Sequence, residues 1–169
     1  VIYTGRVSEA KGCIELFQLA KRFPDKLFLL VGKIYINPSD FSIPPNVRLL
    51  GEMPHDQVLK LLDGADIFLF PSHSEGFSIA LTEAMGKGLP SIVTDVGANR
   101  DMVSDGAGIV VPVSDIDKME LALKAMEGQK IRKQMSDKAV DKVKKEYVIT
   151  RVMEIFILLY QGIIDNGSK

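Results

Sequence analysis

Two glutamates and two basic residues are the side chains of this sequence whose types and spacing could do chemistry. Glu75 and Glu83 lie eight residues apart, and Arg6 and Lys11 lie near the start of the chain. Paired carboxylates can act as general acid and base, ligate a metal, or accept hydrogen bonds from sugar hydroxyls. The cations suit an anionic ligand such as a diphosphate, although two solvated surface cations would give the same pattern. The chemistry therefore depends on the elements that position these four residues.

The glutamates fall on a strand, loop and helix. The apolar run Ile67–Phe70 is typical of a buried strand. Glu75 lies in the polar loop that follows, and Glu83 lies about two turns into the predicted helix. The inward face of this helix is predicted from residues at helical spacing: Phe77, Leu81, Ala84, Met85 and Gly88. Because the first N–H groups of a helix are unpaired, an anion would be stabilised near the helix start.

Arg6 and Lys11 follow the first predicted strand. Arg6 lies in the turn, and Ser8 is predicted to cap a helix whose first turn contains Lys11. A cation there opposes the helix dipole by a few tenths to about 1 kcal/mol. Gly12 inside a helix costs roughly another 1 kcal/mol relative to alanine. These two local penalties indicate an anionic ligand, unless the cations are solvated and the glycine is incidental.

Glu83 has an alternative interpretation as an exposed helical residue that pairs with Lys87 four positions later. Gly76 at the predicted helix entrance weakens this alternative, because a glycine lets a ligand reach the backbone N–H groups.

Strand-like and helix-like patterns alternate along the whole chain, which predicts an α/β fold. The fold expected is a doubly wound, Rossmann-like parallel sheet of about six strands, with helices on both faces and extra C-terminal helices. In such sheets the ligand binds at the carboxyl ends of the strands. Loops 5–12 and 71–78 both follow strand ends, so they are predicted to face one crevice. The predicted strands are Val1–Gly5, Leu27–Val31, Val47–Leu50, Ile67–Phe70, Ser91–Thr94 and Ile109–Val111. The predicted C-terminal helices cover about 115–127, 129–146 and 149–164.

Length and composition are those of one globular domain. The chain has 169 residues, of which 46% are hydrophobic and 25% charged. The formal charge of −1 argues against a nucleic-acid binder. A single cysteine, Cys13, fits a reducing compartment, and no signal peptide or apolar membrane span is visible, so a cytoplasmic location is expected. The abrupt start on a strand predicts a fragment of a longer protein.

The ordered motifs of the chain resemble the retaining glycosyltransferases of family 4, which have GT-B architecture. The resemblance covers nearly the whole chain in order, and it corresponds to the C-terminal, donor-binding half of that family. It implies that residues 1–169 form a single nucleotide-sugar-binding domain and that the N-terminal acceptor domain is absent. The matching residues are Gly5-Arg6-x4-Lys11-Gly12, Pro71-Ser72-x2-Glu75-Gly76-Phe77-x5-Glu83-Ala84-x3-Gly88-x-Pro90, Thr94-Asp95-Val96-Gly97 and Asp105-Gly106-x-Gly108-Ile109.

By matching position, the resemblance implies a role for each site residue. Arg6 and Lys11 would hold the donor diphosphate and neutralise the leaving nucleotide. Glu75 would contact hydroxyls of the transferred sugar, and Glu83 would accept hydrogen bonds from the ribose. The implied catalytic residues are thus Glu75, Arg6 and Lys11. Backbone groups of the helix entrance would line the sugar diphosphate, from Gly76, Phe77, Ser78 and Ile79 to Ala80.

The resemblance also implies the activity. It predicts a retaining, metal-independent hexosyltransferase without a cofactor, whose substrate is a nucleotide-diphospho-sugar, with GDP-mannose favoured. The acceptor would be a glycan, a lipid-linked molecule or a polysaccharide bound by the absent domain, so the isolated domain should be inactive. Peripheral membrane association of the full-length enzyme is compatible with this family. The alternatives are a non-catalytic nucleotide-binding domain and a sugar-nucleotide epimerase of related fold.

Several residues depart from the family pattern or have weaker interpretations. Lys33–Asn37 replaces the glycine or small polar residues that the family has near the base, so the choice among UDP, GDP and ADP stays open. Within this segment, Tyr35 either stacks on the base or packs on the surface. Asp115 and Asp117 resemble a metal-binding pair, but they open a helix, so capping explains them better. Of the remaining candidates, His73 is interpreted as a polar loop residue, and His55 and Cys13 are interpreted as structural residues.

Overall fold

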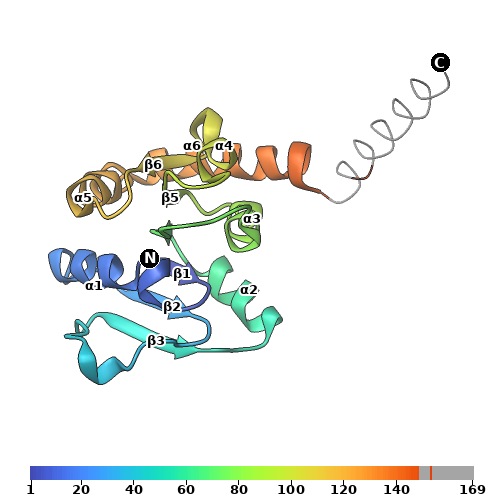
Figure 1. The fold of residues 1–169 in the computed structure, drawn as a ribbon. Helices are drawn as coiled ribbons and strands as arrows, with labels where there is room; N and C mark the ends of the chain where they lie inside the picture. The colour runs from blue at the N-terminus through green and yellow to red at the C-terminus, as the bar shows by residue number, and fades with distance from the viewer. Residues whose placement is uncertain (149–152, 154–169) are drawn as a thin grey trace, which may run out of the picture.

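The protein is an α/β domain built on one parallel sheet (Figure 1). The computed structural model describes residues 1–148 and 153. Within them, six strands lie in the order β3-β2-β1-β4-β5-β6, and every neighbouring pair is parallel. The predicted doubly wound sheet is therefore confirmed. The strands are β1 (Ile2–Thr4), β2 (Phe28–Val31), β3 (Val47–Gly51), β4 (Phe68–Phe70), β5 (Ser91–Thr94) and β6 (Gly108–Val111).

The strand order reverses between β1 and β4. From β1 the chain moves outward through β2 to β3, and it then returns to place β4 on the other side of β1. Ile2 pairs with Phe68 at this junction. Both strands are fully buried, as expected for apolar runs in a sheet covered on two faces. The loops that leave their carboxyl ends flank the crevice in which such folds bind ligands.

Helices cover the sheet on both faces. Figure 1 shows α1 and α5 together on one side and α2 and α3 on the other. α3 packs against α6, so α6 extends the layer of α2 and α3. The α-helices are α1 (Cys13–Arg22), α2 (His55–Asp63), α3 (Ile79–Gly86), α4 (Asn99–Met102), α5 (Ile116–Ala125) and α6 (Gln129–Lys142), followed by a π-helix at Val143–Tyr147. In the described residues, every helix is too short or too polar to cross a bilayer.

Two local predictions about helices are wrong. Lys11 does not lie in the first turn of α1, because a separate 3₁₀ helix, Glu9–Lys11, precedes it and Gly12 is the N-cap. Ser8 makes no side-chain cap. Phe77 does not belong to the buried face of α3, since it precedes the helix and its residue is 53% exposed. Gly88 does not belong to it either, because α3 ends at Gly86, whereas Leu81, Ala84 and Met85 are buried as predicted.

The helix predicted at about 129–146 is confirmed as α6 with its π-helical end. The helix predicted at about 149–164 lies outside the described residues.

Candidate functional site

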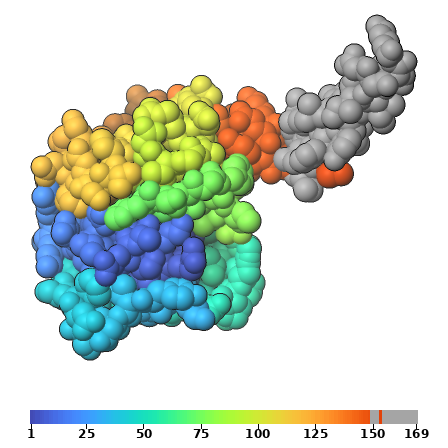
Figure 2. Space-filling model, in the orientation of Figure 1, coloured from blue at the N-terminus to red at the C-terminus, as the bar shows by residue number. Residues whose placement is uncertain are grey.

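The loops after β1 and β4 meet at the carboxyl edge of the sheet. The backbone N–H of His73 donates to the carbonyl of Ala10 over 3.0 Å. Gly12 has φ +76, and a Cβ built on it would lie 2.2 Å from the carbonyl oxygen of Pro71. In Figure 2 the green stretch that follows β4 runs directly beside the blue N-terminal stretch. Loops 5–12 and 71–78, which are predicted to face one crevice, thus lie in direct contact.

Lys11 and Glu75 form an ion pair across these loops. Lys11 Nζ lies 2.5 Å from Glu75 Oε1 and also donates to the carbonyl of Ser74 over 3.1 Å. The two side chains are only 17% and 13% exposed, so the pair is mostly shielded from water. A carboxylate in such surroundings is stable mainly because a cation faces it. The pair thus binds the two loops together and fixes both side chains at the crevice.

Arg6 has a different environment from Lys11. The hydroxyl of Tyr3 donates to the Arg6 carbonyl over 2.7 Å and fixes the turn. Burial raises the pKa of Tyr3 far above its usual value, so this hydroxyl stays protonated and remains a donor. The guanidinium of Arg6 is exposed, and within residues 1–148 and 153 it makes no hydrogen bond or ion pair. It is a cation open to an anionic ligand.

Arg6 and Glu83 line one cavity of about 430 Å³ at the carboxyl ends of β1 and β2. This volume suits a small-molecule site. Lys11 and Glu75 do not line this cavity, so the four predicted site residues fall into two pairs at the carboxyl edge of the sheet. The other lining residues come mainly from the strand ends, α2 and the start of α3: Thr4, Gly5, Val31, Gly32, Lys33, Tyr35, Glu52, Met53, Val58, Ile79 and Ala80.

Glu83 pairs with a residue that the sequence did not single out as its partner. Its Oε1 lies 3.1 Å from Nε2 of His55, at the start of α2. The alternative partner, Lys87, instead binds Asp63 over 2.8 Å. The alternative interpretation of Glu83 as the partner of Lys87 is therefore wrong, and His55 contacts a site residue in addition to starting its helix. The side chain of His55 is 60% exposed, so a ligand could replace it at Glu83.

The entrance of α3 presents backbone groups to the crevice. Ser78 caps the helix, and its hydroxyl accepts from the Leu81 N–H over 3.1 Å. The first N–H groups of a helix have no intrahelical acceptor, and a side-chain cap satisfies only one of them. Ile79 is 71% exposed and lines the cavity. Of the predicted entrance residues, Ile79 and Ala80 line the cavity, whereas Gly76, Phe77 and Ser78 do not.

The weaker sequence candidates lie in different surroundings. Tyr35 is 57% exposed, lines the cavity, and has Lys33 Nζ 5.5 Å from its ring centroid. Asp115 caps α5 by accepting from the Lys118 N–H, as predicted, and Asp117 binds Arg22. Cys13 is buried, and burial raises the pKa of its thiol to about 11.

His73, for which the sequence indicated no partner, lies 2.7 Å from Glu15 Oε1 through its Nε2. Glu15 itself was not identified as a candidate, and its position on the buried face of α1 was the only signal.

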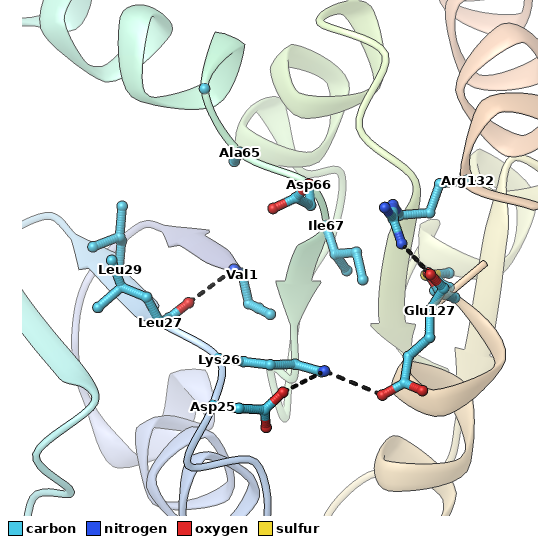
Figure 3. A pocket seen from close by; sticks show the side chains of 12 residues that line it. Val1, Asp25, Lys26, Leu27, Leu29, Ala65, Asp66, Ile67, Glu127 and Arg132 are labelled. Atoms are coloured by element: carbon cyan, nitrogen blue, oxygen red, sulfur yellow. Dashed lines mark hydrogen bonds and ion pairs between the residues drawn. The ribbon is translucent and has the colours of Figure 1, made fainter. Parts of the chain in front are cut away.

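A second cavity, of about 600 Å³, lies at the opposite edge of the sheet (Figure 3). Val1, Leu27 and Ile67, which precede β1, β2 and β4, line it. Figure 3 shows Lys26 between Asp25 and Glu127, and it forms an ion pair with each of them. Because doubly wound sheets bind ligands at the carboxyl edge, this cavity is not the candidate site.

Comparisons with known proteins agree on one family. The family model described as glycosyl transferases group 1 matches residues 1–142. The phosphatidyl-myo-inositol mannosyltransferase of Mycolicibacterium smegmatis is 29% identical over 100% of this chain and 46% of its own length. A GDP-mannose:cellobiosyl-diphosphopolyprenol alpha-mannosyltransferase of Xanthomonas oryzae is 34% identical over 72% of this chain and 35% of its own length. The chain thus spans less than half of either curated relative.

Solved structures share the fold. Alr3699/HepE of Anabaena, crystallised with UDP, superposes with a TM-score of 0.81 at 19% identity, over 95% of this chain and 48% of its own. At this identity the likeness concerns architecture, and the chain corresponds to about half of that structure.

Proposed function

This chain belongs to the group 1 glycosyl transferases, and from that premise we propose that it forms the nucleotide-sugar-binding part of a retaining, metal-independent hexosyltransferase. The observation that carries the proposal is the convergence of the loops after β1 and β4. It brings the Lys11–Glu75 pair and the cavity lined by Arg6 and Glu83 to one edge of the sheet. A diphosphate with a sugar at each end requires cations in the middle and hydroxyl acceptors at both ends.

Each site residue has a role in this proposal. Arg6 and Lys11 hold the donor diphosphate and stabilise the charge that develops on the leaving nucleotide. Glu75 accepts hydrogen bonds from hydroxyls of the transferred sugar, and Glu83 accepts them from the ribose. Backbone N–H groups at the start of α3, around Gly76–Ile79, bind the phosphate oxygens. Lys11 exchanges part of its bond to Glu75 for the phosphate when the donor binds.

The acceptor site belongs to the part of the longer protein that this chain does not include. We propose that the acceptor is a glycan or a lipid-linked molecule and that residues 1–169 alone do not catalyse transfer. Product analysis with the full-length protein distinguishes transfer to an acceptor from epimerisation of the donor. If neither product forms while the nucleotide binds, the chain has a purely nucleotide-binding role.

We propose GDP-mannose as the donor, because curated relatives include mannosyltransferases and one whose name specifies GDP-mannose. The test is a thermal-shift screen of the full-length protein with UDP-, GDP- and ADP-sugars. A ligand at 100 times its Kd stabilises the folded state by about 2.7 kcal/mol, so a preference of one base is measurable. The largest shift is expected with GDP-mannose. A larger shift with a UDP- or ADP-sugar would contradict the choice of base, and no shift with any of them would contradict the function.

The ribose role of Glu83 predicts a selective loss of binding. In the wild-type protein, 2′-deoxy-GDP is expected to bind about tenfold more weakly than GDP, because a lost hydrogen bond to a charged group is worth about 1.5 kcal/mol. In Glu83→Ala the two nucleotides should bind equally, as measured by calorimetry. His55→Ala is the matched control, since it removes the present partner of Glu83 and leaves the carboxylate in place. If His55→Ala abolished the discrimination and Glu83→Ala kept it, the ribose role would be wrong.

A further inference from the structure

A buried carboxylate lies beside the candidate site without a role in the proposed chemistry. Glu15 is on α1, one turn beyond Lys11, and its side chain is 8% exposed. Its Oε1 accepts from the hydroxyl of Ser114 over 2.7 Å and lies 2.7 Å from His73 Nε2. Its Oε2 is buried and has no hydrogen-bond partner among the described residues. Glu15, His73 and Ser114, called here the Glu15 cluster, come from α1, the loop after β4 and the segment after β6.

Stability alone is a poor explanation for the Glu15 cluster. A buried carboxylate loses its hydration, and replacing a buried polar pair with apolar side chains of similar volume is often neutral or stabilising. Ser114 also has φ +57, a left-handed conformation that is unfavourable for a residue other than glycine. Local strain of this kind is held in place by surrounding contacts and is concentrated at functional sites. The cluster therefore calls for a reason beyond packing.

The Glu15 cluster connects directly to the predicted donor-binding residues. Three consecutive residues of the loop after β4 are tied to the N-terminal loop and α1. The His73 N–H donates to the carbonyl of Ala10, and its ring meets Glu15. The Ser74 carbonyl and the Glu75 carboxylate both bind the ammonium of Lys11. A shift of the His73 backbone away from Ala10 and Glu15 would thus move Ser74 and Glu75 relative to Lys11.

We propose that Glu15 is a positioning residue for the donor diphosphate. Through His73 and Ser114 it holds residues 73–75 in the arrangement that presents Lys11 to the phosphates. This inference rests on the proposed function, because it assumes that Lys11 binds the donor. Glu15 itself does not touch the donor. Its effect on binding is therefore transmitted entirely through the loop and Lys11.

The test is a set of variants of the full-length protein titrated with UDP and, separately, with GDP. Glu15→Leu fills the space and removes the acceptor. Because the His73 side chain that it leaves behind is 37% exposed and can be hydrated, the melting temperature is expected to stay close to that of the wild type. The Kd of Glu15→Leu for the nucleoside diphosphate is expected to rise about fivefold or more, because residues of one hydrogen-bond network are energetically coupled to one another. Glu15→Gln keeps an acceptor oxygen for Ser114 and His73, so binding should return to within about twofold of the wild type.

Two controls separate positioning from a general structural effect. Asp117→Asn removes one of the two carboxylates of α5 that bind Arg22 of α1, and it does not contact the loop after β4, so it should leave the Kd unchanged. In a Lys11→Ala background, Glu15→Leu should change the Kd by less than about twofold, because the residue that transmits the effect is missing.

Each outcome decides between the hypotheses. Weaker binding by Glu15→Leu without a lower melting temperature, together with loss of this effect in the Lys11→Ala background, supports the inference. Unchanged binding by Glu15→Leu, or an equal loss in the Lys11→Ala background, overturns the inference and leaves the proposed function intact. Failure of the wild-type protein to bind either UDP or GDP overturns the proposed function and the inference with it.

Discussion

Replacing Arg6 with alanine is expected to lower glycosyl transfer by the full-length protein by about 100-fold or more, as removal of one preorganised donor to a developing negative charge does. The melting temperature should stay unchanged. The guanidinium of Arg6 is exposed and makes no ion pair within residues 1–148 and 153, so its removal leaves no buried charge behind. The measurement is kcat/KM with the donor identified by thermal shift, paired with a melting curve.

Two variants control for this result. Arg6→Lys keeps the charge and loses the forked geometry, so it should recover only part of the activity. Lys21→Ala removes one exposed positive charge from α1 and should leave the rate unchanged. Near-normal transfer by Arg6→Ala would exclude Arg6 from the diphosphate site. Lys11→Ala is a less direct test, because it also leaves the mostly buried carboxylate of Glu75 without its cation.

Replacing Gly12 with alanine is expected to destabilise the domain by about 3 kcal/mol or more, since a left-handed conformation costs an alanine 1–2 kcal/mol and overpacking adds 1–3 kcal/mol. Gly12 has φ +76, and the new Cβ would lie 2.2 Å from the Pro71 carbonyl oxygen. The loops after β1 and β4 would have to separate, which would also break the Lys11–Glu75 pair. A lower melting temperature and weaker nucleotide binding should therefore occur together.

Gly51→Ala is the matched control for Gly12→Ala. Gly51 has φ +73 but nothing within 4 Å of a built Cβ, so only the backbone penalty of about 1 kcal/mol remains. The difference between the two variants isolates the close approach of the loops. Equal destabilisation would mean that the contact between Gly12 and Pro71 does not constrain the site.

The strands could be predicted from the sequence because each is a short apolar run bounded by glycine or proline, and these local signals survive folding. The predicted strand at Ser91–Thr94 matches β5, and every other predicted strand differs from the observed one by at most one residue at either end. The start of α1 could not be predicted in the same way. Gly12 looked like a residue inside a helix, but its left-handed φ and its contact with Pro71 depend on a loop that lies far away in the sequence.

The candidate site could be predicted only in part. The parallel sheet brings strand ends together by rule, so the convergence of Lys11 and Glu75 follows from their positions after β1 and β4. Partners that come from other elements could not be predicted. His55 reaches Glu83 from α2, and Glu15 reaches His73 from α1, because these pairs depend on how the helices pack on the sheet.

The comparison of a nucleoside diphosphate with its monophosphate tests the central claim most directly. The base of both nucleotides is the one that gives the largest thermal shift. Kd is then measured by calorimetry for the full-length wild-type protein and for the double variant Arg6→Ala/Lys11→Ala. If the two cations hold the diphosphate, loss of the second phosphate should weaken nucleotide binding by the wild-type protein about tenfold or more. The same loss should weaken binding by the double variant about twofold or less. Equal affinity of the wild-type protein for both nucleotides would contradict the account.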